Sequence, residues 1–115
     1  MEDIKSLEAM MAQIKGIGSV TDAVLMTKTG MFVLGSIRRT ASLEKFVGMA
    51  AIIMGSAEAA SLEMKDPLRG LIIRTRTSKI MMTFVTSNIL LAVTLLGKQD
   101  ETLVLKELRD IISSY

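Results

Sequence analysis

The chain has 115 residues, of which 50% are hydrophobic and 23% are charged, so it can bury the core of one domain, spanning residues 1–115. It contains no cysteine and no histidine, which excludes disulfides, thiol catalysis, thiolate metal sites and the commonest general base. The net charge of +2 is too small to indicate a nucleic-acid partner. Its acidic start, Met1-Glu2-Asp3, is unlike a signal peptide, so we expect a cytoplasmic protein.

An amphipathic helix is predicted over residues 2–15. Glu2 and Asp3 suit its positive N-terminal end, and Gly16 suits the position after its last turn. Charged residues lie away from its apolar side. That side is formed by Ile4, Leu7, Met10, Met11 and Ile14.

A β-hairpin follows this helix. Residues 20–27 and 31–36 are two short runs that favour β-strands. Lys28-Thr29-Gly30 joins them, and its glycine can adopt a positive φ. The pattern is typical of two antiparallel strands joined by a short turn.

A second helix is predicted over about 42–64. Ser42 or Thr40 can cap its N-terminus, and Asp66-Pro67 ends it because proline cannot continue a helix. Three strands follow, and Asp100 can cap a last helix. The strands are expected at about 69–76, 79–86 and 89–96.

The predicted order is therefore α-β-β-α-β-β-β-α. Residues 71–73 and 89–96 are apolar on both faces of their strands, which indicates a sheet covered on both sides. Two helices can cover one face and one helix the other. The fold class is α+β, a three-layer α/β/α domain with a five-stranded antiparallel sheet.

The second helix has two apolar sides. We expect the broader side to pack on the sheet; it comprises Leu43, Phe46, Val47, Ala50, Ile53, Met54, Ala57 and Met64. The other side forms a heptad-like stripe, the small-residue seam, of Gly48, Ile52, Gly55, Ala59 and Leu62. Each glycine inside a helix lowers the stability of the helix by about 1 kcal/mol relative to alanine. The two glycines of the seam therefore indicate a role that offsets this loss. We interpret it as a contact with a second copy across a two-fold axis. The alternative is a helix buried within one subunit.

No catalytic or cofactor site is evident, and no cofactor is expected. The chain has no phosphate-binding glycine motif and no run of carboxylates typical of a metal site. Residues 46–57 are too few to span a membrane, and Ser87-Asn88 interrupts residues 80–96, so no membrane insertion is expected. Five arginines, Arg38, Arg39, Arg69, Arg74 and Arg76, form either a solvated rim or a basic surface for an acidic partner. Arg74 and Arg76 are expected to share one face of a strand near its end. RNA binding would require stacking aromatic residues, which are missing.

The whole pattern resembles the Roadblock/dynein-light-chain family, which includes the bacterial regulator MglB and is related to longin-like and profilin-like folds. The resemblance covers nearly the whole chain and rests on the order of short motifs. These are Gly16-Ile17, residues 23–26, Lys28-Thr29-Gly30, residues 33–36, Ala50-Ala51, the small residues around Gly55, and residues 90–93.

The resemblance implies a homodimer in which the second helices pair and the sheet continues through the third strands. The dimer interface is then expected to contain Gly48, Ala51, Ile52, Gly55, Ala59, Leu62, Leu71 and Ile73. It also implies that the protein binds or regulates a small Ras-like GTPase. MglB-like proteins do not depend on a donated arginine, so Arg38 and Arg39 are not assigned as arginine fingers.

We therefore expect a non-enzymatic dimeric platform that binds a small GTPase. The alternatives are a structural adaptor without nucleotide-state preference and a small-molecule sensor with a pocket between helix and sheet. The compact length and the ten methionines favour a prokaryotic source.

Overall fold

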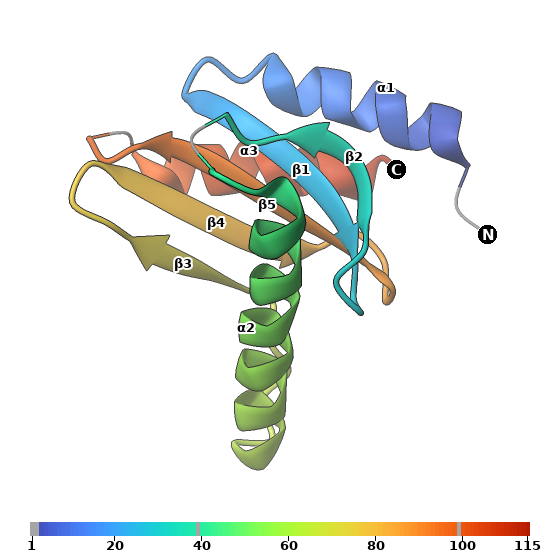
Figure 1. The fold of residues 1–115 in the computed structure, drawn as a ribbon, viewed down its shortest axis with the longest axis vertical. Coiled ribbons are helices and arrows are strands. Elements are labelled where there is room, and N and C mark those ends of the chain that lie inside the picture. Colours follow the sequence, from blue (N-terminus) through green and yellow to red (C-terminus); the bar gives the residue numbers. More distant parts are fainter. Residues whose placement is uncertain (1–2, 39, 99) are drawn as a thin grey trace.

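The computed structural model describes residues 3–38, 40–98 and 100–115, and Arg39 lies outside this part. Its elements follow the predicted order (Figure 1). They are α1 (Ile4–Lys15), β1 (Val20–Thr27), β2 (Phe32–Ser36), α2 (Leu43–Glu63), β3 (Gly70–Arg74), β4 (Ser78–Phe84), β5 (Ile89–Leu96) and α3 (Glu101–Ser113).

The five strands form one antiparallel sheet in the order β2-β1-β5-β4-β3. Helices α1 and α3 cover one face, and α2 lies on the other (Figure 1). The most buried strands, β1 and β5, are neighbours in the interior of the sheet, where successive side chains enter opposite cores. Leu25 faces α1 and α3, whereas Val24 and Met26 face α2. The three-layer prediction is confirmed.

Helices α2 and α3 begin at caps that the sequence predicts, whereas α1 begins at Ile4, two residues after its predicted start. Asp3, Ser42 and Asp100 are the N-caps of α1, α2 and α3. The Asp100 carboxylate accepts a hydrogen bond from the Thr102 backbone N–H at 2.9 Å, which satisfies a donor that has no partner within the helix. Gly30 has a φ of 94°, so the hairpin glycine adopts the conformation expected of it.

The turn between β3 and β4 begins earlier than predicted. Strand β3 ends at Arg74, and the Thr75 backbone N–H donates to the Ser78 carbonyl at 2.9 Å. Arg76 therefore lies in the turn, and the expectation that Arg74 and Arg76 share one strand face is wrong. The backbone hydrogen bond within the turn ends the strand at Arg74, although the alternation of side chains alone would allow the strand to continue.

Helix α2 is longer than the width of sheet beneath it. Its first half packs on the sheet through Val47, Ala50 and Met54, which are buried. Its second half projects beyond the sheet (Figure 1). Ile53 and Met64, which we expected against the sheet, are 42% and 75% exposed. Periodicity identifies an apolar side but does not show where the supporting sheet ends.

Candidate protein-interaction surface

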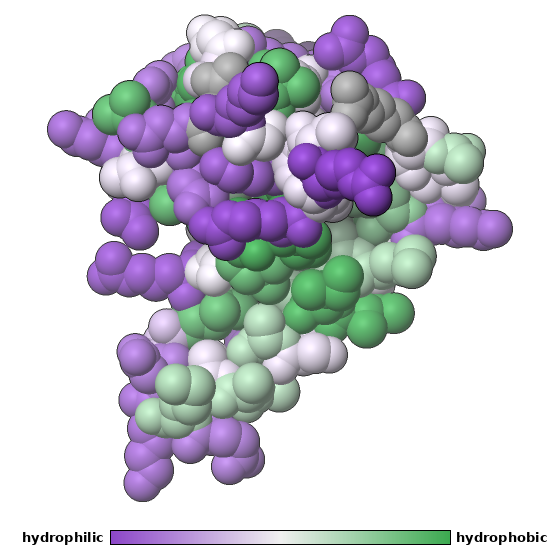
Figure 2. Space-filling view, turned by 90° about the vertical axis from the view of Figure 1, so that its left-hand side faces the viewer, coloured by the Kyte–Doolittle hydropathy of each residue, from purple (hydrophilic) through white to green (hydrophobic). Residues whose placement is uncertain are grey.

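The projecting half of α2, residues 55–63, exposes apolar and small residues where a solvated helix would carry charges. Leu62 is 67% exposed, and Gly55, Ala59 and Ala60 are also exposed. Figure 2 shows apolar surface running from the middle of one face down onto this projection. A continuous apolar surface of this kind marks a protein contact.

Strand β3 is an edge of the sheet and pairs only with β4 among the described residues. Its sequence, Gly-Leu-Ile-Ile-Arg, has no proline and one charge, so it lacks most features that protect an edge from pairing. Leu71 and Ile73 are half-buried on the α2 side of the sheet. The projecting helix and the free edge of β3 are neighbouring surfaces of one molecule (Figure 1).

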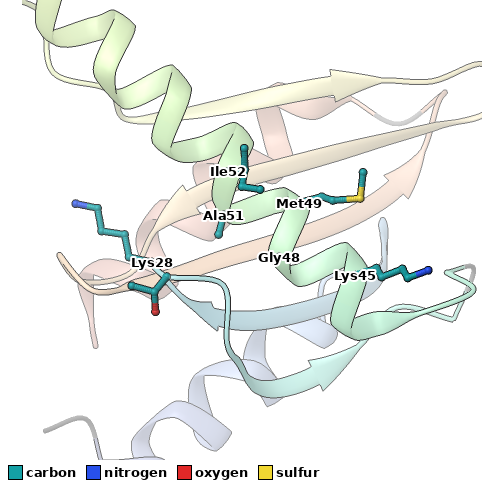
Figure 3. A pocket seen from close by; sticks show the side chains of 7 residues that line it. Lys28, Lys45, Gly48, Met49, Ala51 and Ile52 are labelled. Atoms are coloured by element: carbon teal, nitrogen blue, oxygen red, sulfur yellow. The ribbon is translucent and has the colours of Figure 1, made fainter.

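The predicted interface residues do not all lie together. Gly48, Ala51 and Ile52 line a shallow hollow of about 460 Å³ with Lys28 and Thr29 of the β1–β2 turn (Figure 3). In Figure 1 this turn lies to the right of α2 and β3 extends to its left. The structure therefore separates these three residues from Leu71 and Ile73. Gly55, Ala59 and Leu62 belong to the projection beyond the sheet.

The two seam glycines are not required by packing within the described chain. A Cβ added to Gly48 or Gly55 would meet no atom within 4 Å. Ala51, in contrast, is buried beside the β1–β2 turn, where a Cβ on Gly30 would approach its side chain to 3.5 Å. Ala51 thus packs within its own chain.

The structure also separates the predicted arginines. Arg38 donates through Nε to the Asp22 carboxylate and through a terminal nitrogen to the Thr21 carbonyl, both at 3.0 Å. These bonds tie the loop after β2 to β1, although the Arg38 side chain remains 76% exposed. Arg74 instead forms an ion pair with Glu101 on the opposite side of the sheet, where Lys79 Nζ lies 3.7 Å from the same carboxylate.

Arg38 and the β3–β4 turn border one groove. This groove, about 630 Å³, lies on the α2 side of the sheet and includes Phe46, Ile80 and several hydroxyl side chains. Thr75 and Thr77 line it, and the intervening Arg76 is exposed. Of the predicted rim residues, Arg38 lines this groove, whereas Arg76 lies in the bordering turn and is not part of the lining. Arg39 lies outside the described residues.

No group of three or more carboxylates in residues 3–38, 40–98 and 100–115 could hold a metal ion. In the same part of the chain, α2 is the one helix long and apolar enough to cross a membrane, by length and composition alone. Its first half belongs to the core on the sheet.

The family model for the Roadblock/LC7 domain matches residues 7–95. The chain belongs to the Roadblock/LC7 family. Both the predicted family and the predicted fold are thereby confirmed. No curated protein sequence matches this member of the family.

Solved structures share this Roadblock/LC7 fold at low sequence identity. Myxococcus xanthus MglB has a TM-score of 0.86 at 12% identity, with 98% of this chain and 86% of that chain covered. A Roadblock/LC7 domain from Streptomyces avermitilis has a TM-score of 0.78 at 14% identity, covering 99% and 94%. An MglB described as having a tetrameric arrangement has a TM-score of 0.79 at 10% identity, covering 96% and 84%.

Proposed function

We propose that this protein is a cytoplasmic homodimeric platform that binds a small Ras-like GTPase and regulates it without catalysing a reaction by itself. The observation that carries the dimer is the apolar projecting half of α2 beside the free edge of β3. Two copies related by a two-fold axis would pair their β3 edges and place their projecting helices alongside each other. This contact would bury Ile53 and Met64, which lie on the same side of the helix and which one chain leaves exposed.

The GTPase partner is supported by membership of the Roadblock/LC7 family and by the likeness to MglB. The sequence resemblance implies that such proteins bind or regulate small GTPases. A binding platform also fits a chain that has neither histidine nor cysteine for acid–base or nucleophilic chemistry.

The groove between Arg38 and the β3–β4 turn offers a basic rim for an acidic partner surface. The Arg38 guanidinium is held in place at the rim by Asp22 and Thr21, and the Asp22 carboxylate, which also lines the groove, offsets part of its positive charge. A platform of this kind would regulate by binding one switch conformation of the GTPase more tightly than the other and shifting its population.

The test is affinity capture from native lysate of the source organism, with this protein as bait, in GDP and in a non-hydrolysable GTP analogue. We expect a small GTPase in the eluate under one nucleotide condition. The recovered GTPase is then purified, and its affinity is measured by calorimetry in both states. Arg76→Glu serves as a rim variant, and Lys106→Glu on the exposed side of α3 as its charge-matched control.

Equal affinity for the two nucleotide states would assign the protein to the adaptor class instead. Capture of other proteins with no GTPase in either condition would overturn the proposed function.

A further inference from the structure

A pocket of about 720 Å³ lies between α3 and the β3–β4 half of the sheet, on the face opposite α2. It opens to solvent and reaches inward to Met81 and Leu108, which are 3% and 2% exposed. Ile72, Leu105 and Ile112 continue its apolar wall, and Leu68, Leu71, Met82 and Phe84 also line it. We call this space the α3 pocket.

The α3 pocket exists because two helices do not cover five strands. On this face α1 packs on β1 and against α3, and no third helix lies over β3. The volume falls within the range of small-molecule sites, which are usually apolar with a few polar groups. The pocket therefore has the size and lining of a ligand site, and one of its walls is β3, the strand that we propose pairs in the dimer.

The charges at the α3 pocket all have one sign. Among the described residues that line it, the charged ones are Arg69, Arg74 and Arg109, and no carboxylate lines it. Glu101 forms an ion pair with Arg74, but no ion pair joins Arg69 or Arg109 to a carboxylate in the described part of the chain. Arginine is well suited to bind a carboxylate through two parallel N–H donors.

We propose that the α3 pocket binds a fatty acid, with the alkyl chain between α3 and the sheet and the carboxylate at Arg69 and Arg109. An alkyl chain is thin enough to enter a space between two packed layers. A helix, about 10 Å across with its side chains, is too wide to reach Met81 without separating α3 from the sheet. Met81 can adapt to a flexible chain, because methionine changes shape at little cost.

The test is a titration with sodium dodecanoate below its micelle concentration, observed through ¹³C-labelled methionine methyl groups by NMR. Met81 reports on the α3 pocket, and exposed Met49 on α2 is the remote reference. We expect a saturable change at Met81 and none at Met49. Dodecan-1-ol, which lacks the charge, should bind at least about tenfold more weakly, as expected for the loss of a charge-assisted hydrogen bond.

Two sets of variants test the assignment of each end of the ligand. Arg69→Gln with Arg109→Gln should weaken dodecanoate binding about tenfold, whereas the matched control Arg76→Gln should leave it unchanged. Leu105→Trp should fill the pocket and abolish the Met81 response. Circular dichroism confirms that each variant is folded, and the arginine variants, being at the surface, remain informative if Leu105→Trp does not fold.

Three results would overturn the proposal. They are no saturable change at Met81, an equal change at Met49, and equal affinity for dodecanoate and dodecan-1-ol. A helical Leu- and Glu-containing peptide that shifts Met81 when dodecanoate does not would assign the pocket to a protein partner. None of these results depends on GTPase binding, so the two proposals fail separately.

Discussion

The β1–β2 turn approaches α2 at a pair of glycines, so that a Cβ built on Gly30 would lie 3.3 Å from the Gly48 Cα. The nearby Lys28 Nζ lies 3.1 Å from a Glu58 carboxylate oxygen and 5.8 Å from the centre of the Phe84 ring. These contacts join the β1–β2 turn to α2 at Gly48 and, within the projecting half, at Glu58. The angle of the projecting half therefore depends on the turn between the first two strands.

Gly30→Ala should lower the free energy of unfolding by about 2 kcal/mol, because Gly30 has a φ of 94° and little room beside Gly48. Gly48→Ala should instead stabilise the chain by about 1 kcal/mol, since its Cβ meets open space and alanine favours a helix. Urea denaturation measures both values. A destabilising Gly48→Ala would show that Gly48 is in close contact with a second molecule.

Ile53→Lys should convert the dimer to a monomer. Ile53 is 42% exposed on α2, on the side we assign to the second copy, and a buried unpaired ammonium is costly. Light scattering coupled to size exclusion measures the mass. Gln13→Lys, at an exposed position of α1, is the control and should keep the dimer mass. A dimeric Ile53→Lys protein would remove this side of α2 from the interface.

Gly55→Leu tests the small-residue seam separately. A leucine has room within one chain, so the monomer should fold normally, but its bulk should prevent close approach of a second helix and dissociate the dimer. The matched control is Ala12→Leu on the exposed side of α1. If Gly55→Leu keeps the dimer mass while Ile53→Lys loses it, the helices meet on the β3 side alone.

Leu108→Asp should unfold the domain. Leu108 is 2% exposed in the core between α3 and the sheet, where an unpaired carboxylate would cost several kcal/mol. Leu103→Asp provides a control on the same helix, because Leu103 is 61% exposed and should tolerate the charge. Circular dichroism with urea denaturation compares the two variants. A cooperative transition in Leu108→Asp near that of the parent protein would contradict the assigned core.

Arg76→Glu should weaken the GTPase complex while leaving the dimer mass unchanged. Arg76 lies exposed in the β3–β4 turn, so reversing its charge should act on association more than on folding. Calorimetry in the preferred nucleotide state measures the change against the Lys106→Glu control. An unaltered affinity would exclude the turn from the partner-binding rim.

Local chemistry explains why much of the fold could be predicted. Ser42 and Asp100 cap helices through their own side chains, and Gly30 adopts the positive φ that its turn requires. How far a helix extends over the sheet depends on segments that are distant in the sequence, so it could not be predicted from the helix alone. Ile53 was therefore expected against the sheet, but the structure leaves it 42% exposed beside Met54, which is buried.

The candidate surfaces were likewise predicted only where the local sequence determines them. Periodicity identified the apolar side containing Gly55 and Ala59, whereas the interface implied by the family resemblance also included Ala51, which the β1–β2 turn covers. The α3 pocket was anticipated as a space between helix and sheet without any residue assigned to it. Its position depends on how many strands α1 and α3 leave uncovered, which no single segment encodes.

The free edge of β3 has a consequence for how this protein would choose its partner among related chains. Main-chain pairing at an edge strand is nearly independent of side-chain identity, so β3 by itself cannot distinguish one related chain from another. Discrimination must then come from the projecting half of α2, through side chains such as Leu62 and Met64. A few substitutions on that helix could convert a homodimer into an obligate heterodimer while the sheet remained unchanged.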